Sequence, residues 1–175
     1  MNENIEKYAI PGVGAIIEKE IDGENYILIQ DRVKDRPHEG SNFEIGLLEI
    51  PAGKIQEYEN IYSCLRREVK EETGLTINKI QGEENSEIIS INGYKVLNYT
   101  PFSNSQNIKG YYPIMVQVFI CTTTETAING FTSNETKNVR WEKLLVIENL
   151  LEDHSKFYPM HISTLRKYFK YKHRE

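Results

Sequence analysis

The chain has 175 residues, of which 39% are hydrophobic and 27% are charged, and its net charge is −5. This length supports one well-buried core and is short for two, so residues 1–175 are predicted to form a single globular domain. The acidic balance argues against broad nucleic-acid binding, and no apolar run reaches the roughly 18 residues that a membrane span needs. The N-terminal MNENIEKYAI lacks an apolar signal core, so a cytoplasmic location is expected.

Two strands joined by a tight turn are predicted first. Residues 12–17 and 26–30 are apolar, and the Asp22-Gly23 pair between them is a hairpin signal. The polar segment 31–42 is predicted to be a loop. Its cations, such as Arg32 and Arg36, could bind phosphate, although simple solvation is the alternative.

A further apolar strand is predicted over 43–50, and Pro51-Ala52-Gly53 then bends the chain. A helix is predicted over residues 61–73. Asn60 suits its N-cap, and Gly74 suits the left-handed position after its end.

The helix carries an unusual face. At 3.6 residues per turn, its apolar residues share one stripe, and three carboxylates fall largely within that stripe: Ile61, Cys64, Leu65, Val69, Glu68, Glu71 and Glu72. Ser63, Arg66, Arg67 and Lys70 lie on the other side. Carboxylates that face the interior must be paired, protonated or bound to metal, and a hard divalent cation is the natural partner for three of them. A solvated acidic patch is the plain alternative.

The remaining elements follow from apolar runs and turn signals. We expect a strand over 76–80, a hairpin of 87–91 and 94–99 around Asn92-Gly93, a flexible loop or lid over 100–110, a central strand over 112–122, a turn-rich stretch over 129–138, and helices over 142–151 and 160–171. Cys64 and Cys121 are expected to be reduced packing thiols. The four histidines, His38, His154, His161 and His173, are scattered and expected at the surface.

The segment 53–75 resembles the Nudix box position for position. The matching residues are Gly53, Glu59, Arg67, Glu68, Glu71, Glu72 and Gly74, with Val69 and Leu75 also fitting the pattern. The resemblance implies an α/β fold, the Nudix α/β/α sandwich, in which a mixed β-sheet carries the box helix and a C-terminal helix on its faces.

The resemblance also implies a mechanism. Nudix hydrolases cleave phosphoanhydride bonds with Mg²⁺, and Mn²⁺ can serve as well. By resemblance, the metal ligands are Glu68, Glu71, Glu72 and the carbonyl of Ala52, and Glu71 or Glu72 also serves in catalysis. Glu59 and Arg67 match a pair that holds the loop and helix in shape, so they are interpreted as structural together with Gly53 and Gly74.

Outside the box the assignments are weaker. Glu135, ahead of Trp141, resembles the general base of several members, and a solvated loop glutamate is the equal alternative. Glu49 resembles a family glutamate near the metals. Arg32, Arg36 and Glu49 are therefore the candidate substrate-binding residues.

The substrate is predicted from the residues before the box. Leu48 to Gly53 resembles the form found in ADP-ribose and nucleotide-sugar hydrolases, but Ser90 stands where those enzymes carry a proline. The first hypothesis is therefore hydrolysis of a nucleoside diphosphate linked to another group. The alternatives are a nucleoside-triphosphate pyrophosphohydrolase of the nucleotide-sanitising type and a non-catalytic regulatory module.

The expected partner is a small nucleotide, with no nucleic acid and no membrane. A homodimer is one option that the family allows. Aromatic residues around the 100–110 segment could stack on a base or simply pack, namely Tyr94, Tyr99, Phe102, Tyr111 and Tyr112.

Overall fold

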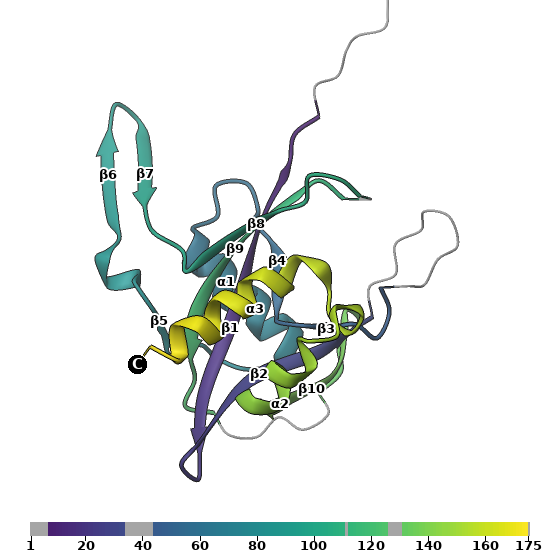
Figure 1. Ribbon diagram of the computed structural model, residues 1–175. Coiled ribbons are helices and arrows are strands. Elements are labelled where there is room, and N and C mark those ends of the chain that lie inside the picture. The colour runs from purple at the N-terminus through teal and green to yellow at the C-terminus, as the bar shows by residue number, and fades with distance from the viewer. Residues whose placement is uncertain (1–6, 34–43, 111, 126–130, 175) are drawn as a thin grey trace, which may run out of the picture.

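A computed structural model describes residues 7–33, 44–110, 112–125 and 131–174 (Figure 1). Its strands are β1 (Ile10–Ile21), β2 (Glu24–Arg32), β3 (Leu48–Glu49), β4 (Ala52–Lys54), β5 (Lys79–Ile80), β6 (Glu87–Ile91), β7 (Tyr94–Asn98), β8 (Ser103–Gln106), β9 (Ile114–Thr122) and β10 (Thr136–Lys143). Its helices are α1 (Ile61–Thr73), α2 (Leu144–Leu150) and α3 (Pro159–Lys172), with short 3₁₀ turns η1 (Glu83–Asn85) and η2 (His154–Lys156).

The sheet is mixed and centred on β1. Within the described chain it has eight strands with the path β10-β2-β1-β9-β5, to which β3, β4 and β8 add along individual strands. β1 pairs in parallel with β9 from Ile10 to Glu18 and antiparallel with β2 from Glu18 to Ile21. Near its start, β1 pairs with β4 instead, so that Gly14 lies opposite Ala52. This divergence of β1 from β2 makes room for the segment that precedes the box helix.

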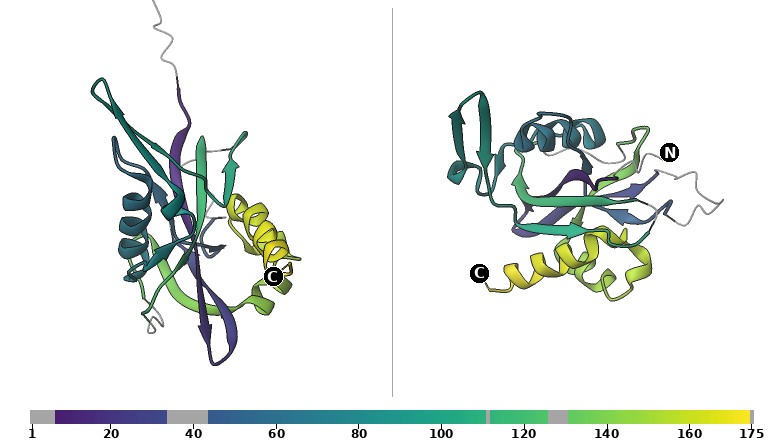
Figure 2. Two further views of the ribbon diagram at one scale, coloured as in Figure 1. Left: turned by 90° about the vertical axis from the view of Figure 1, so that its left-hand side faces the viewer. Right: turned by 90° about the horizontal axis from the view of Figure 1, so that it is seen from above.

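The molecule has three layers. In Figure 2 the sheet stands between α1 on one side and the α2 and α3 pair on the other. The predicted α/β/α sandwich with the box helix and a C-terminal helix on opposite faces is therefore confirmed. None of the helices that the structure describes is long and apolar enough to cross a bilayer.

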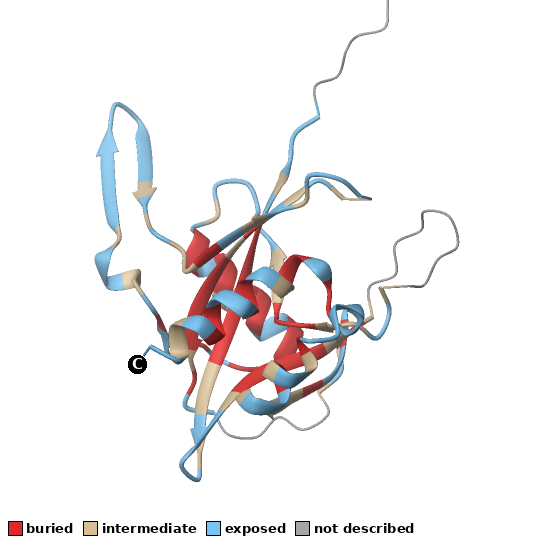
Figure 3. Cartoon of the chain, in the orientation of Figure 1, coloured by how far each residue is buried: buried red, intermediate tan, exposed pale blue. Residues whose placement is uncertain are grey.

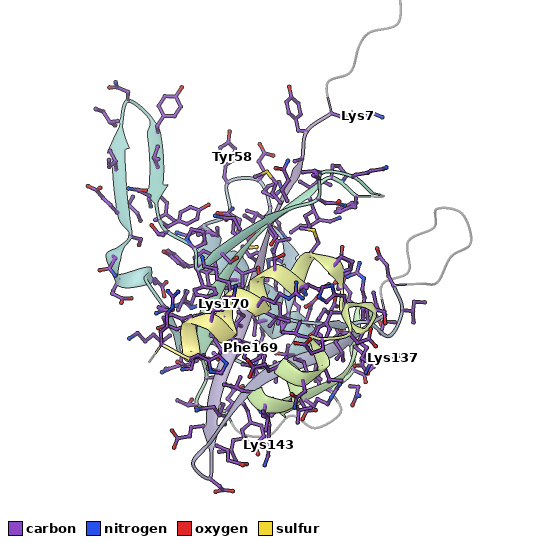
Figure 4. All side chains as sticks on the ribbon, viewed as in Figure 1. Lys7, Tyr58, Lys137, Lys143, Phe169 and Lys170 are labelled. Atoms are coloured by element: carbon purple, nitrogen blue, oxygen red, sulfur yellow. The ribbon has the colours of Figure 1, made fainter. Side chains whose placement is uncertain are left out.

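Strand alternation divides the core into two parts, because successive side chains point to opposite faces of the sheet. Val13, Ala15, Ile17 and Leu28 pack toward α1, whereas Ile16 and Ile27 pack toward α3. Figure 3 shows the buried residues gathered where the helices meet the sheet. Along α3 the helical period of about 3.6 residues buries Phe169 and exposes its neighbour Lys170, both labelled in Figure 4.

Both predicted hairpins are confirmed. The β1–β2 turn has positive φ at Asp22 and Gly23, and the β6–β7 turn has positive φ at Asn92 and Gly93, as tight hairpin turns require. The β6–β7 arm pairs only with itself among the described strands and projects from the body in Figure 1. Both free cysteines are buried, as expected.

Several boundaries were wrong. The strand predicted over 43–50 shortens to β3, because Gly46 takes a left-handed conformation (φ +83°) in a turn that donates to the carbonyl of Arg32. The predicted lid contains β8, which adds to the edge of β9. Strand β5 covers only the end of 76–80, and β10 begins within the stretch expected to be turns. Polar strand residues at a sheet edge give little alternation, which explains why β8 was missed.

Histidine placement also needs correction. His154 and His173 are exposed, as expected, and His38 lies outside the described residues. His161 is instead buried, with 1% exposure, at the start of α3. Its Nδ1 accepts a hydrogen bond from the backbone N–H of Ile50 at 3.2 Å. Burial, with a contribution from the positive charge of Arg32, lowers the pKa of His161 to about 3.

Candidate active site

The box helix forms as its sequence predicts. The Asn60 side chain caps its first turn by accepting from the backbone N–H of Tyr62 at 2.9 Å, and the N–H of Gly74 closes its end on the carbonyl of Lys70. Gly74 has φ +74°, a conformation that a side chain would strain. Apolar residues of the helix pack under the sheet, so the carboxylates near its C-terminal end are carried toward β4.

Glu68 lies directly over Gly53. A Cβ atom built on Gly53 would stand 1.8 Å from the carboxyl carbon of Glu68, so any other residue here would displace that carboxylate. Glu68 is 8% exposed, and its Oε1 accepts from Nη1 of Arg67 at 2.7 Å. Gly53 is thus required because two segments approach closely there.

Glu72 is the most enclosed of the box carboxylates, with 2% exposure. Its Oε2 accepts from the backbone N–H of Ala52 at 3.0 Å and from Nε2 of Gln30 at 2.9 Å. The hydroxyl of Thr136 in β10 donates to its backbone carbonyl at 2.8 Å. Glu68 and Glu72 therefore both face the Ala52–Gly53 segment, from which the family metal ligand at Ala52 is expected.

Glu71 differs from these two. Its side chain is 61% exposed and pairs with Nη1 of Arg67 at 3.3 Å, so the prediction that it shares the inner face was wrong. Glu71 lies at the edge of the inner stripe of the helix, and its side chain points outward to solvent. Its predicted role in metal binding and catalysis stays a prediction.

Arg67 contacts three glutamates of the box, one in the loop and two in the helix. Its guanidinium contacts Glu59 through Nε and Nη2, each at 2.8 Å, and also reaches Glu68 and Glu71. Helical periodicity predicts Arg67 on the outer side of the helix, but its long side chain reaches back to Glu59 in the preceding loop and to the carbonyl of Lys54 at the end of β4. Hydrogen bonding from Arg67 lowers the pKa of Glu59 to about 2. One positive charge thus serves three carboxylates within the described residues, and the cluster keeps negative charge toward β4.

A second arginine occupies the other side of the site. Arg32 is 5% exposed and contacts Glu44 at 3.0 Å and Glu49 at 2.9 Å, while its guanidinium stacks over Tyr158 with 4.1 Å from Cζ to the ring centroid. Burial alone would lower its pKa, but the two carboxylates outweigh that effect and the pKa of Arg32 is raised. Glu49 is also buried and accepts from Gln30 at 3.3 Å.

The other predicted residues are less closely gathered. Glu135 is exposed in the turn before β10, next to Thr136, which contacts the end of the box helix. Arg36 and Tyr111 lie outside the described residues. Tyr99 packs against Tyr62 and Phe119, and Phe102 packs against α3, so the packing interpretation holds for these two aromatics.

Three residues in this arrangement were missed by sequence analysis: Gln30, Thr136 and His161. Gln30 offered a signal, because it follows the buried run of β2 and shares the face of Leu28, so a polar side chain had to point at the box helix. Thr136 and His161 gave none, since their contacts join segments far apart in the chain.

The residues fit a divalent cation. The carboxylates of Glu68 and Glu72 offer oxygen ligands, which hard cations prefer, and both carboxylates are buried against the Ala52–Gly53 segment. Across the described ranges, no group of three or more His, Cys, Asp or Glu side chains is gathered closely enough to hold a metal alone. Mg²⁺ does not need such a cage, because it is commonly held by one or two carboxylates together with water and substrate oxygens.

Comparison with known proteins agrees with this geometry. Residues 9–161 match the NUDIX domain family. Because this match covers most of the chain, the chain belongs to the NUDIX domain family. The fold and the site agree with this family, and the class of protein is a Nudix hydrolase. Comparison with curated proteins gives no significant match.

Solved structures show the same fold at low identity. The NUDIX domain of Shewanella oneidensis NrtR complexed with ADP ribose has TM-score 0.65 and 14% identity, covering 97% of this chain and 93% of that one. A C. elegans Ap4A hydrolase binary complex has TM-score 0.54 and 15% identity, with 95% and 99% coverage. The MutT protein from Methanosarcina mazei Go1 has TM-score 0.54 and 20% identity, with 97% and 99% coverage. These similarities support the fold but not a substrate.

Proposed function

We propose that this protein hydrolyses a phosphoanhydride bond in a nucleoside diphosphate linked to another group, of the ADP-ribose or nucleotide-sugar type. The products are a nucleoside monophosphate and a phosphorylated remainder. The observation that carries this proposal is the pair of buried carboxylates, Glu68 and Glu72, held against the Ala52–Gly53 segment. The residues ahead of the box favour this substrate class, and one structural neighbour binds ADP ribose.

Glu68 and Glu72 would hold the divalent ion, with Glu71 and the carbonyl of Ala52 completing the protein ligands. When bound, Mg²⁺ or Mn²⁺ supplies positive charge against the phosphate oxygens and activates water for attack. Each carboxylate is oriented before substrate arrives: Arg67 holds Glu68, and the Ala52 N–H holds Glu72. Such preorganisation lowers the cost of reaching the reactive arrangement.

Proton removal from the attacking water is assigned to a carboxylate. Glu135 is exposed to solvent, stands beside Thr136 and so lies near the end of the box helix. A solvated carboxylate of this kind can accept a proton and release it to bulk water. Glu71 or Glu72 is the alternative base, and the pH–rate profiles of Glu135→Gln, Glu71→Gln and Glu72→Gln are compared to separate the three candidates.

A substrate panel read by mass spectrometry tests the proposal. The panel contains ADP-ribose, nucleotide sugars, dinucleoside polyphosphates and nucleoside triphosphates, each with Mg²⁺ and each with a chelator as the control. AMP and ribose 5-phosphate from ADP-ribose, formed only with Mg²⁺, support the proposal. Free pyrophosphate from triphosphates as the main product supports the nucleotide-sanitising alternative.

Binding without turnover would point to the regulatory alternative. Calorimetry with ADP-ribose and Mg²⁺ measures this directly. A protein that binds ADP-ribose but releases no product from any compound in the panel contradicts the enzymatic proposal.

A further inference from the structure

Gln30 occupies an unusual place for an amide. It is fully buried, at 0% exposure, in a strand whose preceding residues Ile27, Leu28 and Ile29 belong to the hydrophobic core. Its side chain leaves the sheet on the face covered by α1. Burying an amide in an apolar layer is unfavourable unless its polar atoms are used, so its contacts should have a purpose.

The amide nitrogen joins two carboxylates from different elements. Nε2 donates to Oε2 of Glu72 at 2.9 Å and to Oε1 of Glu49 at 3.3 Å. An amide nitrogen carries two hydrogens, so these contacts use its full donor capacity. Glu72 is thereby tied to Glu49 and, through Glu49, to Arg32.

The orientation of the amide is fixed by its neighbours. The buried Oε1 atom has no hydrogen-bond partner, which by itself would suggest that the amide should be turned over. Turning it would place the oxygen against two carboxylate oxygens and remove both hydrogen bonds, a larger loss. The amide is therefore held nitrogen-first toward Glu49 and Glu72.

The effect on Glu72 is specific. Its Oε2 receives two donors, the Gln30 amide and the Ala52 backbone N–H, from two different strands. Two donors on one oxygen fix the plane of the carboxylate, which one donor alone would leave free to rotate. Groups that orient metal ligands in this way commonly change metal affinity or activity by about 10–100-fold when they are removed.

We propose that Gln30 is a positioning residue: it orients the Glu72 carboxylate for the divalent ion and couples it to the buried Glu49–Arg32 pair. This inference rests on the proposed function, because it assumes that Glu72 is a metal ligand. It extends the site from the box helix to the second strand of the sheet.

The test compares Gln30→Met with wild type. Methionine keeps the length and volume of the side chain but cannot donate. Mn²⁺ binding is titrated by electron paramagnetic resonance without nucleotide, and thermal unfolding is measured in parallel. We expect Gln30→Met to bind Mn²⁺ about 10–100-fold more weakly. At saturating Mn²⁺, kcat should largely recover, with little change in the KM for the nucleotide.

Gln81→Met is the matched control. Gln81 is exposed, and its side-chain amide donates to the Tyr171 hydroxyl at 3.3 Å and not to a carboxylate, so this variant should bind Mn²⁺ like wild type. Gln30→Asn is the second variant, because it keeps an amide but withdraws it by one methylene. Weak Mn²⁺ binding is expected there as well.

The outcomes are distinct. Wild-type Mn²⁺ affinity in a folded Gln30→Met protein, with or without a lower melting temperature, overturns the inference and leaves Gln30 a structural residue. Failure of both Gln30 variants to fold overturns it too, since the residue then acts on the fold as a whole. If wild type and Glu72→Gln bind Mn²⁺ equally, the proposed function itself fails.

Discussion

Two arginines organise two polar clusters that meet at the Ala52–Gly53 segment, and they do so in different ways. The Arg67 cluster contains Glu59, Glu68 and Glu71, all from one short stretch of chain, and the Arg67 side chain is 25% exposed. The Arg32 cluster brings together Glu44 and Glu49, from the segment that ends in β3, and Tyr158, from the distant residue that precedes α3, and its guanidinium is nearly buried.

The difference shows that one part of a site can be built from residues close together in the sequence and the other part from residues far apart. Residues about one helical turn apart, such as Arg67 and Glu71, become neighbours whenever the helix forms, so the Arg67 cluster follows from α1 and its preceding loop. The Arg32 cluster exists only after β2, β3 and α3 have packed. Gln30 links the two parts, because it contacts both Glu49 and Glu72.

The largest expected effect comes from removing the carboxylates where the clusters meet. Glu68→Gln and Glu72→Gln should each lower kcat by orders of magnitude while the protein stays folded, because an amide is a poor ligand for a divalent cation. Steady-state assays and circular dichroism measure the two properties. Glu57→Gln, at an exposed loop position, is the control. Near-normal rates in both variants would remove the metal-site assignment.

Removing each arginine should separate the clusters by stability. Arg32→Met leaves Glu44 and Glu49 enclosed without their cation, which should lower the free energy of unfolding by about 3–5 kcal/mol. Arg67→Met removes a partly exposed arginine and should cost about 1 kcal/mol. Urea unfolding at pH 7 measures both. Equal losses would show that the clusters do not differ in burial as described.

Acid should affect Glu59 of the Arg67 cluster and His161, which packs against Tyr158 of the Arg32 cluster, over different pH ranges. The pKa of His161 is lowered from 6.5 to about 3, so the unfolded chain takes up its proton first and stability falls as pH drops below 6.5. The pKa of Glu59 is lowered from 4.5 to about 2, so its contribution is lost between those values.

Two variants test whether His161 and Glu59 are responsible for the loss of stability in these two pH ranges. His161→Asn can still accept from Ile50 but does not titrate, so its melting temperature should change less between pH 6.5 and 4.5 than that of wild type. Glu59→Gln should flatten the lower range only. Unchanged profiles in both variants would contradict the assignment.

The smallest expected effect concerns the reactivity of the two cysteine thiols. Burial raises the pKa of Cys64 to about 12 and also raises that of Cys121, so neither thiol should react readily with a thiol reagent at pH 8. Both should react after unfolding in urea. Rapid modification of the native protein would show that one of them is reached by solvent.

Sequence patterns predicted the elements that depend on local interactions. The box helix begins after Asn60 and ends at Gly74, as predicted. Asn92-Gly93 forms the turn of the β6–β7 hairpin, and Glu59 forms the expected contact with Arg67. Each depends on residues within a few positions of one another. The sequence also indicated a hard-cation site from the carboxylates of that helix.

Tertiary structure decided which side chains face the site. It turned Glu71 outward, buried His161 and brought Gln30 to Glu72. Periodicity gives the direction of a side chain only to within part of a helical turn, and it says nothing about which distant strand will lie opposite. The sequence by itself therefore determined the box helix and its carboxylate chemistry, whereas the packing of β2, β3 and α3 determined the groups that hold those carboxylates in place.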